Sequence, residues 1–278
     1  MHVPKLPVDL QNVWRRAVDD RFVALSGPDS GEWLQGQATQ NVQRLEVGQS
    51  AEFCLCTPTG QIAALAQVYR RPEDWLVAVP EVCLPALLQR LEETVILEDM
   101  AWNVLPGGAF PFAGFGSSSE PEVPDARFGV AGGWFSEQPP GRELSLEEWD
   151  FARFAAGVPA MGLDVDAKVL PPELGPAFEE RTVSYAKGCY VGQEVLMRLH
   201  SRGHTNRVWV ALVLGDGAQP GPLQTPAGTP AGTLMRRVGS SPWGSALVRN
   251  AFAEPRTVLR AGGVEAEVVA LPLRRASS

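Results

Sequence analysis

The sequence is poor in the residues that build disulfide frameworks and metal centres. Its 278 residues include 4 cysteines and 3 histidines, and only Cys54 and Cys56 lie close together. A disulfide scaffold, a structural zinc site and a permanent iron–sulphur cluster are therefore not expected. Cys54 and Cys56 would share one face of a strand. They are either core cysteines or two ligands of a soft metal ion that would need a third ligand from elsewhere in the chain.

Long apolar runs are also missing. No stretch approaches the ~20 residues of a membrane-spanning helix, and the beginning of the chain is too polar for a signal peptide. Hydrophobic residues make up 45% and charged residues 20%, which are ordinary globular values. We expect a cytoplasmic protein with no membrane association.

The net charge of −8 is unevenly distributed. Acidic residues dominate up to residue 186, and basic residues dominate after it. Such asymmetry fits an anionic partner for the basic part. It fits equally a basic domain that docks on an acidic one within the same molecule.

Motifs for nucleotide binding and for serine hydrolases are absent. The run Gly188–Gly192 lacks the Lys-Ser/Thr ending of a phosphate-binding loop, and no G-x-G-x-x-G follows a predicted strand. No G-x-S-x-G nucleophile elbow occurs. We therefore do not expect a P-loop or Rossmann enzyme.

Hydrophobic periodicity predicts an α+β fold. The predicted strands and helices before residue 100 follow in this order: strand 21–25, helix 29–45, strands 51–57, 61–70 and 75–79, helix 80–93, strand 94–98. Residues 106–142 are rich in Gly, Pro and Ser, which predicts loop with one strand within 127–135.

Helices and short strands are predicted in the second half of the chain. Ser145 with Glu148 has capping-box spacing and predicts a helix to about Ala156; a second helix is predicted over 193–200. Four β-rich runs, at 208–214, 232–237, 243–249 and 264–269, predict a small antiparallel barrel or sandwich of four to six strands. We place the domain boundary near Thr205, giving regions 1–204 and 205–278.

The densest candidate site is the segment from Tyr185 to Glu194. Two glycines flank a cysteine and an aromatic residue, and glycine allows close backbone approach or positive φ. Lys187 and Arg198 would favour the thiolate form of Cys189. The alternative is a tight turn before a helix with a buried, inert cysteine.

Residues 187–194, K-G-C-Y-V-G-Q-E, resemble the signature of the YgfZ-type folate-binding proteins, relatives of the glycine cleavage T protein. Further matching segments occur in the same order along the chain: Gly27-Pro28-Asp29, L-Q-G-Q-A-T at 34–39, T-P-T-G at 57–60, A-G-V-P at 156–159, Pro171-Pro172-Glu173, Arg198 and Arg202-Gly203. The resemblance spans about residues 21 to 215.

The resemblance implies two α+β lobes and a C-terminal antiparallel β-barrel, in a three-lobed ring around a central folate channel. It implies tetrahydrofolate or a derivative as cofactor. The partners it implies are iron–sulphur client enzymes, among them radical tRNA methylthiotransferases, with tRNA involved only indirectly. Cys189 takes the role of functional thiol.

The resemblance also assigns roles to the residues around Cys189 and to a set of candidate folate contacts. The signature loop contributes Lys187, Gly188, Tyr190, Gly192, Gln193 and Glu194. The candidate folate contacts are Trp149, Arg153, Glu173, Arg198 and Arg202.

Some of these contacts have alternatives. Trp149 either stacks on the folate or is a core residue of an amphipathic helix. The basic stretch 198–207 meets folate carboxylates, meets RNA phosphates, or is a solvated helix end.

The chain departs from the T-protein pattern at the expected general acid/base. Ala63 and Ala64 stand where a catalytic carboxylate is expected, so T-protein aminomethyl transfer is not expected. The favoured reading is a folate-binding accessory protein that supports iron–sulphur cluster assembly or repair and, through client enzymes, tRNA modification. The alternatives are a folate-dependent aminomethyltransferase or demethylase, and a non-catalytic binding module.

Overall fold

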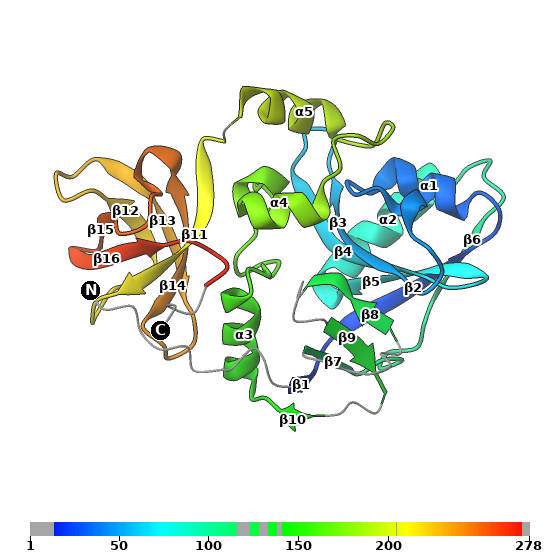
Figure 1. Ribbon diagram of the computed structural model, residues 1–278, viewed down its shortest axis with the longest axis horizontal. Helices are drawn as coiled ribbons and strands as arrows, with labels where there is room; N and C mark the ends of the chain where they lie inside the picture. The colour runs from blue at the N-terminus through cyan, green and yellow to red at the C-terminus, as the bar shows by residue number, and fades with distance from the viewer. Residues whose placement is uncertain (1–13, 116–122, 128–132, 138–140, 204, 274–278) are drawn as a thin grey trace. The chain divides into compact units, whose positions relative to one another are not determined.

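The computed structural model describes residues 14–115, 123–127, 133–137, 141–203 and 205–273 (Figure 1). The chain forms two compact units. Unit 1 includes Ser145–Glu179 and Leu199–Ser278; unit 2 includes Leu10–Leu144 and Glu180–Arg198. The predicted boundary near Thr205 stays a prediction.

Unit 2 contains a five-stranded antiparallel sheet with strand order β3-β4-β5-β2-β6. Its strands are β2 (Asp20–Ser26), β3 (Ser50–Cys56), β4 (Ile62–Arg70), β5 (Asp74–Pro80) and β6 (Ala101–Val104). Two helices accompany it, α1 (Ser30–Gln37) and α2 (Leu84–Thr94), with short 3₁₀ turns at Val42–Arg44 and Glu81–Cys83. β3, β4 and β5 consist mostly of buried residues, so the core of this unit lies on them.

A second sheet of unit 2 has the order β10-β1-β7-β9-β8. Its strands are β1 (Trp14–Ala17), β7 (Phe112–Phe115), β8 (Val123–Asp125), β9 (Gly133–Ser136) and β10 (Arg142–Glu143). The one strand predicted within 127–135 overlaps β9, whereas β7 and β8 lie where loop was predicted. β7 pairs with β1, nearly 100 residues away along the chain, and strands this short carry no readable periodicity of their own.

The predicted helix 29–45 ends earlier than its periodicity indicates. Helix α1 ends at Gln37, and Ala38 is extended, with φ −78° and ψ 139°. The Thr39 hydroxyl, which is buried, donates to the carbonyl of Thr182 (2.6 Å) and accepts from the amide of Cys54 (2.9 Å). These long-range hydrogen bonds hold the chain extended where local propensity favours helix.

The predicted strand 94–98 is also wrong. The segment is an irregular turn between α2 and β6. The carboxylate of Glu98 accepts hydrogen bonds from the amides of Ile96 (2.7 Å) and Leu97 (3.0 Å). These amides therefore bind a side chain and not a neighbouring strand.

The described part of unit 1 begins at Ser145, directly before helix α3 (Leu146–Ala155). The predicted capping box is confirmed, because Ser145 Oγ accepts from the amide of Glu148 while the Glu148 carboxylate accepts from the amide of Ser145. A 3₁₀ turn at Pro171–Leu174 follows. Helices α4 (Pro176–Thr182) and α5 (Gln193–Arg202) each belong partly to both units, and α4 was not predicted.

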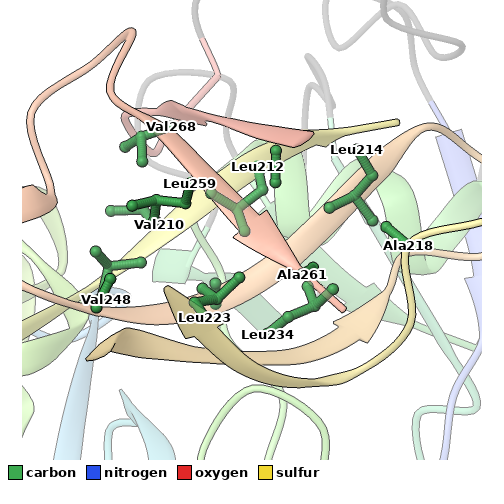
Figure 2. Close-up of a cluster of buried hydrophobic side chains, with 13 residues drawn as sticks. Val210, Leu212, Leu214, Ala218, Leu223, Leu234, Val248, Leu259, Ala261 and Val268 are labelled. Carbon is green, nitrogen blue, oxygen red and sulfur yellow. The ribbon is translucent and has the colours of Figure 1, made fainter. Parts of the chain in front are cut away.

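The C-terminal part of unit 1 is a closed antiparallel barrel of order β11-β14-β13-β12-β15-β16. Its strands are β11 (Arg207–Leu214), β12 (Gly221–Gln224), β13 (Pro230–Arg237), β14 (Trp243–Arg249), β15 (Val258–Ala261) and β16 (Val264–Val269). Aliphatic side chains fill its interior, Leu212, Leu234 and Val268 among them (Figure 2). The predicted α+β class and antiparallel barrel are confirmed.

In the described part of the chain, every helix is too short or too polar to cross a bilayer.

Candidate functional site

The signature loop of unit 2, residues 185–192, is anchored by a buried lysine. Lys187 is 8% exposed, and its ammonium donates to the carbonyls of Gln35 (2.5 Å), Ala38 and Gln40 (3.1 Å) at the C-terminal end of α1. A cation at that end also interacts favourably with the helix dipole. Burial lowers the pKa of Lys187 to about 7. The neutral amine retains N–H donors for the carbonyls.

Tyr190 is the second anchor of the loop. The Lys187 Nζ lies 4.9 Å from the centroid of its ring, within cation–π range. The phenol is 7% exposed, and its hydroxyl has no hydrogen-bond partner among the described residues. Burial raises the pKa of Tyr190, so the ring is neutral.

Gly192 fixes the end of the loop against the turn 57–60. Its φ is +86°, and an added Cβ would lie 2.7 Å from the carbonyl oxygen of Thr57 and 3.1 Å from the Cα of Gly60. Only glycine allows this approach and this backbone conformation. Gly188, by contrast, has no atom within 4 Å of where a Cβ would be.

Cys189 is the exposed cysteine of the chain, whereas Cys54, Cys56 and Cys83 are buried. It follows the open Gly188 and precedes the buried Tyr190. The two anchors thus leave a two-residue tip, Gly188-Cys189, at the surface. The alternative that this cysteine is buried is wrong. Burial raises the pKa of the Cys56 thiol to about 12, so that thiol stays protonated.

The charged neighbours of the signature have other partners than the thiol. Lys187 Nζ points at carbonyls and a ring, and no contact with Cys189 is found among the described residues. Glu194 and Arg198, both exposed on α5, form an ion pair at 2.7 Å. Gln193 is the first residue of that helix, and its amide donates to the carbonyl of Tyr190.

The candidate folate contact Arg153 takes part in a buried ion network of unit 1. Its guanidinium donates to Asp164 (2.8 Å), to the carbonyl of Val158 (2.8 Å) and to Asp150. Arg236 of β13 pairs with the same two carboxylates, at 2.6 Å and 2.9 Å. Burial alone would raise the pKa of Asp164, but the two guanidinium groups hold it below its usual range.

Glu173 is 5% exposed and is held by Arg207, whose guanidinium donates to both carboxylate oxygens at 2.8 and 3.1 Å. The amide of Leu170 donates to the same carboxylate. Glu173 and Arg153 thus both make extensive hydrogen bonds within unit 1. Trp149 is 9% exposed, and Arg202 is exposed at the end of α5.

Sequence reasoning missed Asp150, Asp164, Arg207 and Arg236 as partners of the predicted residues. Asp150 lies three residues before Arg153 on α3, a spacing at which helical side chains pair, and this signal was available. Arg236 comes from the barrel, and nothing local in the sequence connects it to α3. Among the described residues, no group of three His, Cys, Asp or Glu side chains is arranged to hold a metal ion.

The comparisons with known proteins bear on these features. A tRNA-modifying protein YgfZ from Enterobacter sp. (strain 638) is 26% identical over 236 residues, which cover 69% of each chain. The YgfZ of Klebsiella pneumoniae (strain 342) is 24% identical over 246 residues, 73% of this chain and 71% of that protein. An uncharacterized protein of Haemophilus influenzae is 24% identical over 193 residues, 67% of this chain and 68% of that protein. No protein-family model matches.

Among solved structures, the glycine cleavage system aminomethyltransferase T of Bartonella henselae superposes with a TM-score of 0.72 at 15% identity, covering 95% of this chain and 87% of that one. The chain therefore has the fold of the glycine cleavage T proteins. Within that class its fold is of the YgfZ type, as the curated relatives indicate.

Proposed function

We propose that the chain is a folate-binding accessory protein that supports iron–sulphur cluster assembly or repair and, through client enzymes, tRNA modification. Cys189 is its functional thiol. The observation that carries the proposal is the presentation of this thiol, exposed at a two-residue tip between the buried Lys187 and Tyr190. A surface cysteine without a role would not need its loop to be held in place by two buried neighbouring side chains.

The relatives support the link to tRNA, because several of them are named tRNA-modifying proteins. The role in iron–sulphur maintenance and the cytoplasmic location come from the family resemblance alone. The clients we propose are iron–sulphur enzymes such as radical tRNA methylthiotransferases. We propose that tRNA itself does not contact the chain directly.

Folate is proposed as tetrahydrofolate or a derivative, which would supply a one-carbon carrier. Trp149 of unit 1 offers an aromatic surface for the pterin or aminobenzoyl ring, and Arg202 of the same unit offers a cation for the glutamate carboxylates. Arg198, which pairs with Glu194, remains a candidate contact from the family resemblance alone. Arg153 is already paired with Asp150 and Asp164, and Glu173 with Arg207, so both fit the ligand less well. They are proposed to shape the site around the folate.

Complementation tests the thiol. Cys189→Ala is expressed in a bacterial strain deleted for its YgfZ-type protein, and methylthio-modified nucleosides in its tRNA are measured by mass spectrometry. We expect wild type to restore the modification and Cys189→Ala to fail while accumulating normally. Cys83→Ala, at a buried cysteine, is the matched control. Full restoration by Cys189→Ala would reject the thiol.

Calorimetric titration tests the folate. We expect tetrahydrofolate to bind wild type and to bind Trp149→Ala more weakly. Because Trp149 is buried, its variant is first checked for folding by circular dichroism. Arg202→Ala, at an exposed residue, is a second variant that leaves the core intact. Absence of heat with wild type would reject folate binding.

A further inference from the structure

Unit 2 exposes two large aliphatic side chains at consecutive positions of the chain. In the turn between α2 and β6, Ile96 is 78% exposed and Leu97 is 94% exposed. Single exposed apolar residues are common on protein surfaces. Two consecutive exposed aliphatic residues in one turn are a different case, because they concentrate exposed apolar area at one place on the surface.

The backbone holds this turn in place. The Glu98 carboxylate accepts from the amides of Ile96 and Leu97, and these hydrogen bonds lower the pKa of Glu98. One residue on, the amide of Asp99 donates to the Asp29 carboxylate at 2.7 Å. A side chain at Gly27 would collide with the carbonyl oxygen of Asp99, at 2.4 Å. The turn is thus fixed to the loop before α1.

A cavity of about 430 Å³ lies beside the turn. Leu97 lines it together with Trp33, whose indole donates to the hydroxyl of Thr94 at 2.9 Å. Gly36 and Gln37 of α1 also line it. We call the exposed pair Ile96 and Leu97 the knob, and the cavity beside it the recess.

The charged residues that line the cavity are all acidic. Asp29, Glu32 and Glu98 line it, and Glu92, Glu93 and Asp99 are exposed in the adjoining segment. No lysine or arginine occurs in the sequence between Arg90 and Arg127. The guanidinium of Arg90 points inward, donating to Gln37 Oε1 (2.8 Å) and to the carbonyl of Cys56 (2.8 Å).

We infer that this knob, recess and acidic rim form a docking surface for a protein with an apolar groove bordered by lysine and arginine. Nucleic acid and anionic lipid surfaces would be repelled by the carboxylates. A second copy of this chain, with a net charge of −8, would be repelled as well. A basic protein surface is the occupant that gains from both the apolar pair and the rim.

The docking surface shares helix α1 with the signature loop. Gly36 lines the cavity, and its carbonyl accepts from the amide of Val191, two residues after Cys189. A partner on this surface is therefore the candidate client of the thiol. This last step rests on the proposed function; the docking surface itself does not.

Photo-crosslinking in cells tests the surface. Benzoylphenylalanine is incorporated in place of Leu97 in the full chain, in the complemented deletion strain, and the adduct is identified by mass spectrometry. We expect one protein whose contacting peptide is rich in lysine or arginine. An adduct between two copies of the chain, an adduct with RNA, or no adduct at all would overturn the inference.

Binding to the identified protein, purified, gives the quantitative test. We expect Ile96→Ser/Leu97→Ser to weaken its affinity at least tenfold and Glu32→Lys at least threefold, with weaker binding at higher salt. Val82→Ser, at a residue 65% exposed elsewhere in unit 2, is the matched control and should stay within twofold. Unchanged affinity for the double variant would overturn the inference. If Cys189→Ala restores tRNA modification in the deletion strain and the crosslink at Leu97 still forms in that variant, the functional role of the thiol is rejected. The docking surface is then still supported.

Discussion

The ammonium of Lys187 lies over the ring of Tyr190, and Cys189 stands exposed between these two buried residues. Lysine and tyrosine usually reach outward with their polar ends. Here both side chains point inward, and the small residues between them are the ones that face solvent. The two buried side chains hold the loop in place and leave the Cys189 thiol at the surface. Single substitutions test this arrangement.

Loss of the Lys187 anchor should destabilise unit 2. Lys187→Met leaves the carbonyls of Gln35, Ala38 and Gln40 without their donor. Buried acceptors without a partner cost about 1–3 kcal/mol, so we expect a loss of about 2 kcal/mol or more in urea denaturation. Lys168→Met, at an exposed lysine, should change stability by no more than about 0.5 kcal/mol. Equal stability of both variants would contradict the anchor.

The thiols should differ sharply in accessibility. In the folded protein we expect one cysteine, Cys189, to react quickly with an aromatic disulfide reagent, and all 4 to react after denaturation. The fast phase should vanish in Cys189→Ala. Because a thiolate is the reacting species, the rate measured against pH also gives the titration of Cys189 directly. A second fast thiol would mean that Cys54, Cys56 or Cys83 is also accessible.

Two glycines of the signature should respond differently to the same substitution. Gly192→Ala places a Cβ 2.7 Å from the Thr57 carbonyl in a backbone with positive φ. We expect a cost of about 1–3 kcal/mol from the backbone conformation, increased by the collision. Gly188→Ala meets no atom within 4 Å and should fold like wild type. Thermal unfolding of the two variants side by side decides this.

Acid should weaken unit 1 through Asp164. Arg153 and Arg236 hold its pKa below the usual value of 3.8 although the carboxylate is buried. Its contribution to stability is therefore complete above about pH 4 and is lost as pH falls through the lower folded-state pKa. We expect unfolding monitored against pH to show this loss in wild type.

Asp164→Asn should remove that acid dependence and lower stability at neutral pH. Breaking a buried ion pair by removing one partner costs about 3–5 kcal/mol. Asp216→Asn, at an exposed aspartate of the same unit, is the control and should leave the pH profile unchanged. If the stability of Asp164→Asn falls with decreasing pH in the same way as that of wild type, the stability of the ion network does not depend on the charge of Asp164.

The sequence predicted those parts of the fold whose signals are local. The hairpin of β3 and β4, the barrel strands β11, β13, β14 and β16 and the capping box at Ser145 all rest on alternation, turn residues or fixed spacing within a few positions. The barrel strands β12 and β15 were not predicted. The short strands β7 and β8 were not predicted, because their pairing partners determine them. The composition around Ile96 and Leu97 predicts a strand. The segment is a turn instead, in which the Glu98 carboxylate accepts hydrogen bonds from both amides.

At the site, the residues of the signature were predicted and their directions were not. Nothing in K-G-C-Y says that the lysine points inward, since that depends on the end of α1, some 150 residues earlier. The ion-pair partners Arg207 of Glu173 and Arg236 of Asp164 likewise come from distant parts of the sequence, so a local motif does not reveal them. A motif names the side chains of a site, whereas the rest of the fold decides which of them reach solvent.

The two-part make-up of unit 2 has a consequence for synthesis on the ribosome. Its sheets are complete by residue 144, but the segment Glu180–Arg198 that carries the cysteine emerges only after the first residues of unit 1. The cysteine is therefore synthesised after all the strands of these two sheets. A nascent chain halted before residue 180 contains those strands but not Cys189.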